Sequence, residues 1–290
     1  MNEQVCKADM GDDGAAVVDT YGYPVETTGN AVLDILEHRS STRAFARDDD
    51  DRPVAVTDEQ RAAILHAASR APSAGAMMMY SIVSIREQAT LDRLADLCDH
   101  QPMIAKAPWA LIFVVDYAKW IDLFEHVGCF EPEFVEHTGK APRRAPGLGD
   151  FAIAAQDAVI AAQNAVVAAE ALGLGSCYIG DIVENAEEVA ELLGLPLYTM
   201  PLSMLIIGTP RKERPAIAHP VVNLVHEERY RRADTATVDA QVAEMDAMFR
   251  PHAREVGERV VDIYTRKHTS PFMAEMSRSM EWWFKNWLGK

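Results

Sequence analysis

Apolar residues recur with the spacing of an amphipathic helix in several stretches of the chain. The first stretch follows Asn30, a residue that can cap a helix. In the second, Thr57 and Gln60 have the spacing of a capping box, and Pro72 is expected to stop the helix. Similar patterns predict helices over residues 91–97, 151–172 and 185–194 and over most of the last sixty residues.

Shorter apolar stretches have the composition of strands. They lie at residues 80–85, 109–115, 176–179 and 202–207, with helical patterns between them. This alternation predicts an α+β protein in which a sheet is layered against helices. The helix 185–194 is expected to begin with a second capping box, formed by Asn185 and Glu188, and to end at Gly194.

Three regions differ in composition. Residues 1–27 are acidic and lack periodicity, so we expect an N-terminal extension, whereas residues 28–230 carry the strand and helix signals of the main domain. Residues 231–290 are expected to form a helical extension. Its aromatic end has to be buried on the main domain or on a partner subunit. Within the main domain, residues 126–149 are rich in Pro, Gly and charge, as in a long loop or lid.

The overall charge narrows the possible partners. The 290-residue chain carries a formal net charge of −16, which disfavours binding to nucleic acid or to anionic membranes. Its uninterrupted apolar runs are too short to span a bilayer, and we expect a cytoplasmic protein. The four cysteines and nine histidines show neither the spacing of a metal site nor that of a dense disulfide framework.

Two small basic clusters stand out in this acidic chain. One runs from Arg39 to Arg43 and includes three hydroxyl residues, and the other runs from Arg211 to Arg214 after the last predicted strand. Guanidinium, ammonium and hydroxyl groups are the donors that bind phosphate well. The clusters therefore indicate an anion site, although each taken alone is more often a solvated surface run.

The Gly-rich stretch Gly173–Gly180 does not fit a dinucleotide-binding loop. In a Rossmann fingerprint a strand precedes the glycines and a helix follows them, whereas here the predicted order is helix, glycines, strand. Gly173 is sufficiently explained as the residue that ends a helix.

Five motifs, taken together, resemble the FMN-dependent nitroreductase family in order and spacing. They are Arg39-Ser-Ser-Thr-Arg-Ala-Phe45, Ala71-Pro-Ser-Ala-Gly75, Ala105-Lys-Ala-Pro-Trp109, the stretch from Ala162 to Gly180, and Gly208 followed by Lys212-Glu-Arg214-Pro215. The resemblance covers about residues 31–230. It implies a mixed β-sheet flanked by helices, a three-layer sandwich, in an intertwined homodimer with FMN at the subunit interface.

The resemblance also implies which residues bind the cofactor. The FMN phosphate and the pyrimidine edge of the flavin are held by a segment that corresponds to Arg39, Ser40, Ser41 and Arg43, and a second phosphate clamp corresponds to Lys212 and Arg214. The segment that packs on the flavin from the partner subunit corresponds to Pro72, Ser73, Ala74 and Ala76. The turn whose backbone N–H faces flavin N5 corresponds to Ile179 and Gly180. Neither a catalytic side chain nor a metal is implied.

One position departs from the family's pattern. The family usually has Asn after its Ala-Gly pair, where the amide donates to the polar edge of the flavin, and this chain has Ala76. An unmet buried polar edge costs about 1–3 kcal/mol, so we expect water or another side chain to replace the amide.

The implied reaction is a ping-pong cycle. NADH or NADPH delivers hydride to flavin N5, and a nitroaromatic, a quinone or a similar small electrophile then accepts the reducing equivalents. Two alternatives remain open: a specialised flavin enzyme, such as a reductive dehalogenase, ene reductase or dehydrogenase, and an FMN-binding sensor or carrier without turnover.

Overall fold

The computed structural model describes residues 29–140, 143–212, 221–252 and 254–290. The chain forms two compact units. We call residues 41–213 with 274–290 the core unit and residues 1–40 with 214–273 the helical unit. The described helices of the helical unit are α1 (Ala31–His38), α9 (Thr235–Phe249), α10 (Glu258–Ile263) and the π-helical turn η3 (Tyr264–His268).

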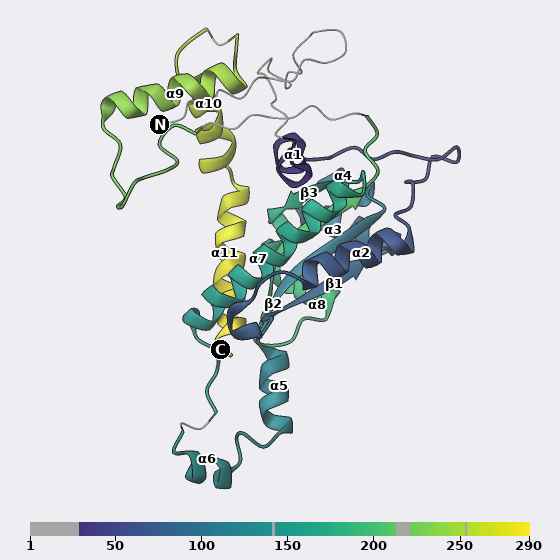
Figure 1. Cartoon of the computed structure of the whole chain (residues 1–290), viewed down its shortest axis with the longest axis vertical. Coiled ribbons are helices and arrows are strands. Elements are labelled where there is room, and N and C mark those ends of the chain that lie inside the picture. Colours follow the sequence, from purple (N-terminus) through teal and green to yellow (C-terminus); the bar gives the residue numbers. More distant parts are fainter. Residues whose placement is uncertain (1–28, 141–142, 213–220, 253) are drawn as a thin grey trace. The chain divides into compact units, whose positions relative to one another are not determined.

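The core unit is built on a four-stranded antiparallel sheet. Its strands are β1 (Tyr80–Ile85), β2 (Trp109–Asp116), β3 (Gly175–Ile179) and β4 (Thr199–Gly208), in the order β1-β2-β4-β3 (Figure 1). The α+β class is thus confirmed. The resemblance implies a mixed sheet. Within the part of the chain that the structure describes, the parallel pairing consists of one bridge between Ser41 and Ser176.

Helices pack on the sheet and on one another. Residues 109–115 of β2 are all buried, as expected for a strand whose two faces are both covered. The helices of the core unit are α2 (Asp58–Ser69), η1 (Ala74–Ala76), α3 (Gln88–Leu97), α4 (Pro102–Ala105), α5 (Ala118–His126), α6 (Pro132–Thr138), α7 (Leu148–Ala171), η2 (Gly180–Val183), α8 (Ala186–Leu193) and most of α11 (Phe272–Trp287).

The long helix α7 crosses the sheet beside α2 (Figure 1). Its inner face consists mainly of small residues, which allow the strands and α2 to approach closely. Among the described helices it alone is long and apolar enough to cross a membrane, but such a helix is also typical of a soluble core. Its buried residues are Ala154, Asp157, Ala158, Ala161, Ala162, Ala165, Val166 and Ala169.

Local sequence signals explain some helix ends and fail at others. Thr57 and Gln60 form both halves of the predicted capping box of α2. At α8 the predicted capping box is wrong, because Asn185 adopts a left-handed φ of 48° and its side chain donates to Leu97 O instead. A tertiary contact substitutes for the cap, since Ser279 Oγ accepts from the first amide of α8.

Two differences from the predicted elements involve proline. Strand β4 starts at Thr199, three residues earlier than predicted, and includes Pro201. Pro201 lies opposite Val114 of β2, at the point where the register between β2 and β4 shifts, and proline is tolerated at such irregularities of a sheet. In the predicted loop 126–149, Pro132 begins the short helix α6, as proline often does at a first helical position.

The aromatic end of the chain is buried within the core unit. Trp283 and Trp287 on α11 are fully buried. Their indole N–H groups donate to Val183 O at 2.9 Å and to Gly147 O at 3.0 Å. Helix α11 therefore supports the turn that follows Gly180 and the start of α7.

Candidate functional site

The first basic cluster continues as an extended segment along one end of the sheet. Thr42 N donates to Ser176 O at 2.8 Å, and further on Ala46 N donates to Thr209 O at 2.8 Å. In the opposite direction, Arg211 N donates to Ala44 O at 3.0 Å. These backbone bonds bring the two basic clusters, which are about 170 residues apart in the sequence, side by side.

Close packing at Gly208 sets the position of this segment. A Cβ added at Gly208 would lie 2.7 Å from the Pro108 ring and 2.8 Å from the Phe45 ring. Both rings are rigid, so a larger residue would push the segment away from the end of β4. Phe45 is itself buried, and it anchors the segment between two arginines, Arg43 and Arg47.

A cavity of about 610 Å³ opens beside this segment. Four cationic residues line it, with one carboxylate, Asp51. In a chain of net charge −16, such a cluster of cations is a local site for an anion. The four cations are Arg43, Arg47, Lys106 and Arg211.

Sequence reasoning found two of these four cations and missed the other two. Arg43 and Arg211 belong to the basic clusters, and the structure brings them into one cavity, whereas Arg47 and Lys106 had no predicted role. Lys106 lies inside the motif Ala105–Trp109, and its place in that motif was the sequence signal that could have indicated a role for it. Arg47 also bonds to Asp51 at the rim, which leaves Arg43, Lys106 and Arg211 as the main cations of the cavity.

The turn predicted to face the flavin lies at the other end of β3. Ser176 pairs with the basic segment near the start of β3, and Gly180 follows the end of this strand. The two are separated by about 13 Å at 3.3 Å per strand residue. Ile179 is buried and Gly180 is exposed, so the backbone of Gly180 is accessible at this end.

The third predicted segment forms a loop with an unusual backbone. Gly75, Ala76 and Met78 have left-handed φ values of 57°, 55° and 48°. A non-glycine residue in such a conformation costs about 1–3 kcal/mol and persists where its surroundings hold it. Pro72, Ala74 and Ala76 are exposed along this loop, and Ser73 is half-buried.

The other residues predicted from the two basic clusters are Arg39, Ser40, Lys212 and Arg214. Arg39 and Ser40 are at the end of the helical unit, and Lys212 is exposed next to Arg211. Arg214 lies outside the described residues. Of the residues predicted to hold the phosphate, Ser41, Arg43 and Lys212 are therefore described within the core unit, and their role in FMN binding stays a prediction.

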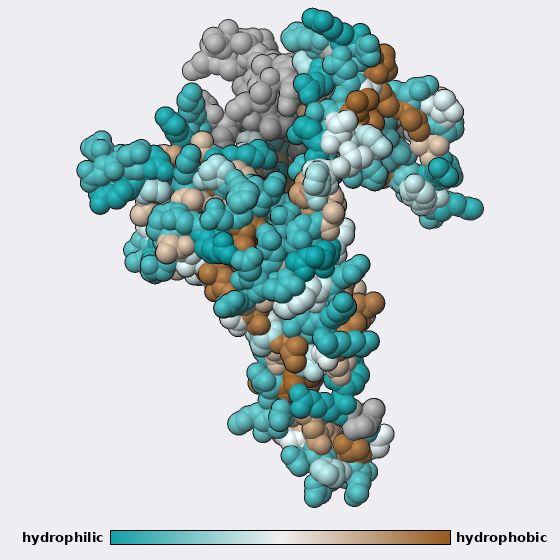
Figure 2. All heavy atoms as spheres, turned by 180° about the vertical axis from the view of Figure 1, so that it is seen from behind, coloured by the Kyte–Doolittle hydropathy of each residue, from teal (hydrophilic) through white to brown (hydrophobic). Residues whose placement is uncertain are grey.

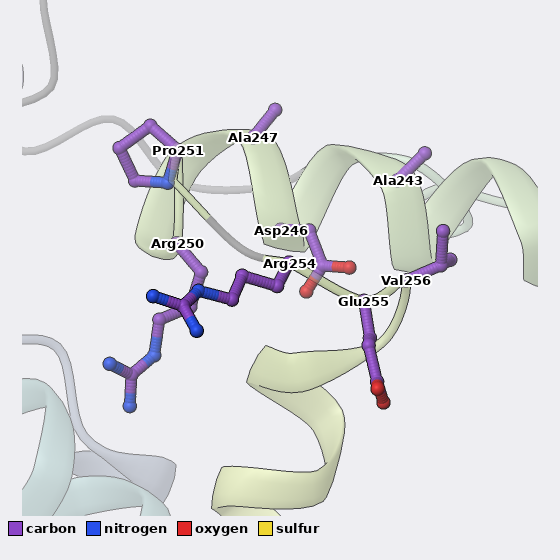
Figure 3. A pocket seen from close by; sticks show the side chains of 8 residues that line it. All are labelled: Ala243, Asp246, Ala247, Arg250, Pro251, Arg254, Glu255 and Val256. Atoms are coloured by element: carbon purple, nitrogen blue, oxygen red, sulfur yellow. The ribbon is translucent and has the colours of Figure 1, made fainter.

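A second cavity, in the helical unit, provides a contrast. It measures about 290 Å³ and lies between the end of α9 and the start of α10, where Arg250 and Arg254 extend in a similar direction (Figure 3). Its charges are used within the unit: Asp246 accepts from the backbone N–H of Arg259 at 3.0 Å, and Arg250 pairs with Asp262 at 3.4 Å. We therefore interpret it as a structural junction between helices rather than a ligand site.

Comparison with known proteins gives relatives that cover most of the chain. Over 215 residues the chain is 32% identical to an FMN reductase [NAD(P)H] of Bacillus subtilis, covering 73% of this chain and 79% of the relative. Over 218 residues it is 33% identical to an oxygen-insensitive NADPH nitroreductase of Salmonella typhimurium, covering 73% and 81%.

Solved structures have the same fold. Nitroreductase A from Vibrio parahaemolyticus matches 90% of this chain and 99% of its own, with a TM-score of 0.71 and 24% identity. The NADPH:FMN oxidoreductase from Vibrio harveyi, solved with NAD+, matches 86% and 97%, with a TM-score of 0.66 and 25% identity. A sequence profile described as the nitroreductase family matches residues 36–209. The resemblance drawn from the five motifs is confirmed, and the chain belongs to the nitroreductase family.

Proposed function

We propose that this protein binds FMN and transfers reducing equivalents from NADH or NADPH to a small electrophile such as a nitroaromatic or a quinone. One observation carries the proposal: a cationic cavity at one end of β3 and an accessible backbone turn, Gly180, at the other. A phosphate at one end and a ring system at the other would match this arrangement. The relatives support it, since they are named as reductases of FMN or nitro compounds that use NAD(P)H.

The residues present fit this cofactor. The guanidinium groups of Arg43 and Arg211 are suited to bind its phosphate or its pyrimidine edge, with Lys212 adjacent. Gly180 is exposed, and we expect its N–H to donate to the ring; we expect the ring to pack on the loop from Pro72 to Ala76, whose Pro72, Ala74 and Ala76 are exposed. Bound FMN would supply the hydride-accepting chemistry, and the protein supplies binding, orientation and charge.

Titration of the cofactor-free protein with FMN tests this proposal. Binding to the wild-type protein should quench FMN fluorescence. Arg43→Gln and Arg211→Gln should each weaken FMN binding by about tenfold. A hydrogen bond to a charged group contributes about 1.5–3 kcal/mol, and the lower end of that range applies because these side chains are exposed. Arg93→Gln is the matched control, because Arg93 is a surface arginine paired with Glu188. Equal affinity in all four proteins would contradict the cationic cavity as the binding site.

Anaerobic mixing then separates an enzyme from a binding protein. Rapid bleaching of the flavin absorbance by NADH or NADPH, followed by reoxidation with a nitroaromatic or quinone, is the expected result. A flavin that neither nucleotide reduces would instead favour the sensor or carrier. The rates with the two nucleotides would establish which one the protein prefers.

We further propose that the protein is a cytoplasmic homodimer. On α7 the side chains of Ile153, Val159 and Ile160 are 39–50% exposed, and on α1 those of Val32 and Leu33 are more than half exposed. Figure 2 shows hydrophobic residues interrupting an otherwise hydrophilic surface. Exposed apolar stripes of this kind are typical of subunit contacts. Light scattering of the FMN-loaded protein should give twice the mass of the chain, and a stable FMN-bound monomer would contradict the proposal.

A further inference from the structure

The loop from Ser73 to Met79 is held by side chains that lie far away in the sequence. The carboxylate of Asp157, in the middle of α7, accepts from Ala74 N at 2.9 Å through Oδ1 and from Met79 N at 3.3 Å through Oδ2. One carboxylate thus binds both ends of the loop, with one oxygen for each end. Between these ends lie the left-handed residues Gly75, Ala76 and Met78.

Asp157 is an unusual residue for its position. It is 2% exposed and lies on the inner face of α7, where most of the other buried residues are alanine. A buried carboxylate is retained only where hydrogen bonds and nearby charge compensate for lost hydration. Here the two loop amides provide the hydrogen bonds. The Lys119 ammonium, which donates to Tyr80 O, provides a positive charge nearby. Burial lowers the pKa of Lys119, and the Asp116 and Asp157 carboxylates oppose that shift.

Other contacts on the loop leave its outer surface open. Trp120 Nε1 donates to Met77 O at 2.9 Å, and Met78 N donates to Ser73 Oγ at 3.3 Å. Ala74, Ala76 and Met78 remain exposed. The inner side of the loop is therefore fixed by α7 and Trp120, and the accessible side is the one available to a ligand.

We propose that Asp157 is a positioning residue, which fixes the backbone of residues 73–79 in the shape that receives the flavin ring; this rests on the proposed function. The role requires a carboxylate specifically. An Asn side chain has one oxygen and one NH₂ group, so it satisfies one loop amide and turns a donor toward the other. Asp157→Asn should thus release one end of the loop while α7 keeps its length and packing.

Asp150→Asn provides the matched control. Asp150 is on the same helix, carries the same charge and also accepts from a backbone amide, that of Gly147. Its hydrogen bonds go to Gly147 N and to the Arg144 guanidinium rather than to the loop. Both variants lose one negative charge and one carboxylate of α7, and only Asp157→Asn alters the loop.

Two measurements on the full-length protein test the inference. FMN affinity is measured by fluorescence titration, and the protection of residues 73–79 is measured by hydrogen exchange in the cofactor-free protein. Relative to Asp150→Asn, Asp157→Asn should weaken FMN binding about tenfold or more and lose protection at one of the two amides, Ala74 N or Met79 N. Asp157→Glu keeps the charge but moves it by one methylene, and it should give intermediate values.

Each outcome bears on a specific claim. FMN affinity and loop protection that match the Asp150→Asn control in both Asp157 variants would overturn the positioning role. If Asp157→Asn does not fold, Asp157→Glu decides the matter, since unchanged affinity and protection in that variant would also overturn it. A wild-type protein that binds no FMN would instead overturn the proposed function.

Discussion

The basic segment 41–47 and the loop 73–79 are both expected to border the flavin, but the protein holds them in different ways. The basic segment is paired with β3 and with the residues after β4 through backbone hydrogen bonds. The loop contains left-handed residues and is held by the side chains of Asp157 and Trp120. Backbone pairing leaves the side chains of the first segment free to serve as cations, whereas the shape of the loop depends on single side chains elsewhere in the chain.

The largest effect on stability and on FMN affinity is expected at Gly208, where the paired basic segment packs closely against the end of β4. Gly208→Ala places a Cβ within 2.8 Å of the Pro108 and Phe45 rings, so the basic segment has to move away from the sheet. We expect the free energy of unfolding to fall by about 1–3 kcal/mol, as for other overpacked sites. FMN affinity should fall with it, because Arg43 moves with the segment.

Urea denaturation and FMN titration check this expectation. Gly149→Ala is the control, since a Cβ at Gly149, in the first turn of α7, meets no atom within 4 Å. It should leave stability unchanged or slightly raised. If Gly208→Ala and Gly149→Ala behaved alike, the segment would not depend on the close approach at Gly208.

A smaller effect is expected in the loop, at Ala76. Its φ of 55° disfavours alanine, whereas glycine and asparagine adopt this conformation more readily. Ala76→Gly should therefore raise the free energy of unfolding by about 1 kcal/mol. Ala76→Asn should raise it by a similar amount and also tighten FMN binding severalfold, because it restores the amide that the family usually has there.

The two variants separate backbone strain from the contact with the flavin. Thermal unfolding of the cofactor-free protein reports the strain, and FMN titration reports the contact. If Ala76→Gly tightened FMN binding as much as Ala76→Asn, the amide would have no part in the gain. A fall in stability for both variants would show that the left-handed backbone at Ala76 carries no strain.

The smallest expected effect is a pH dependence of amide protection. It should appear where a backbone N–H donates to a titratable side chain, and not where it donates to another backbone group. Asn185 N donates to Glu275, and hydrogen bonds from Arg278 above all lower the pKa of Glu275 from 4.5 to about 2. Because the folded pKa lies below the ordinary value, this stabilisation is complete above about pH 4.5 and is lost as the pH falls toward 2.

Amide protection, corrected for intrinsic exchange, checks this expectation. The Asn185 amide should lose protection by less than tenfold per pH unit below 4.5, since the Glu275 side chain is 33% exposed and partly screened. The Thr42 amide, which donates to the backbone oxygen of Ser176, should show no such slope. Glu275→Gln should abolish the slope at Asn185, and a slope that survives this change would exclude Glu275 as its origin.

The sequence predicted well what short-range chemistry determines. The capping box of α2 depends on two residues three positions apart, and β1 was predicted with its observed bounds because its composition is that of a strand. That the two basic clusters, Arg39–Arg43 and Arg211–Arg214, indicate an anion site was a hypothesis from their residue types, and Arg43 and Arg211 each belong to one of them. The structure brings these two residues to one cavity, and their role in FMN binding stays a prediction.

What the sequence could not provide depends on contacts between distant residues. Asn185 has the residue type of a helix cap, yet a tertiary partner, Ser279, takes that role. The left-handed φ of Ala76 has no signature in its own side chain. Asp157 did leave a signal, an acidic residue in the middle of an Ala-rich helix, but its partners lie 83 and 78 residues away and only the fold reveals them.

The attachment of one loop to a distant helix also limits how it can be engineered. Residues 73–79 cannot be exchanged as a cassette between homologous proteins unless the recipient has a carboxylate at the position of Asp157 and an indole at that of Trp120. Chimeras that join residues 73–79, 120 and 157 from one parent should keep the loop's shape. Chimeras with a crossover between residues 79 and 120 should lose it whenever the parents differ at those two anchors.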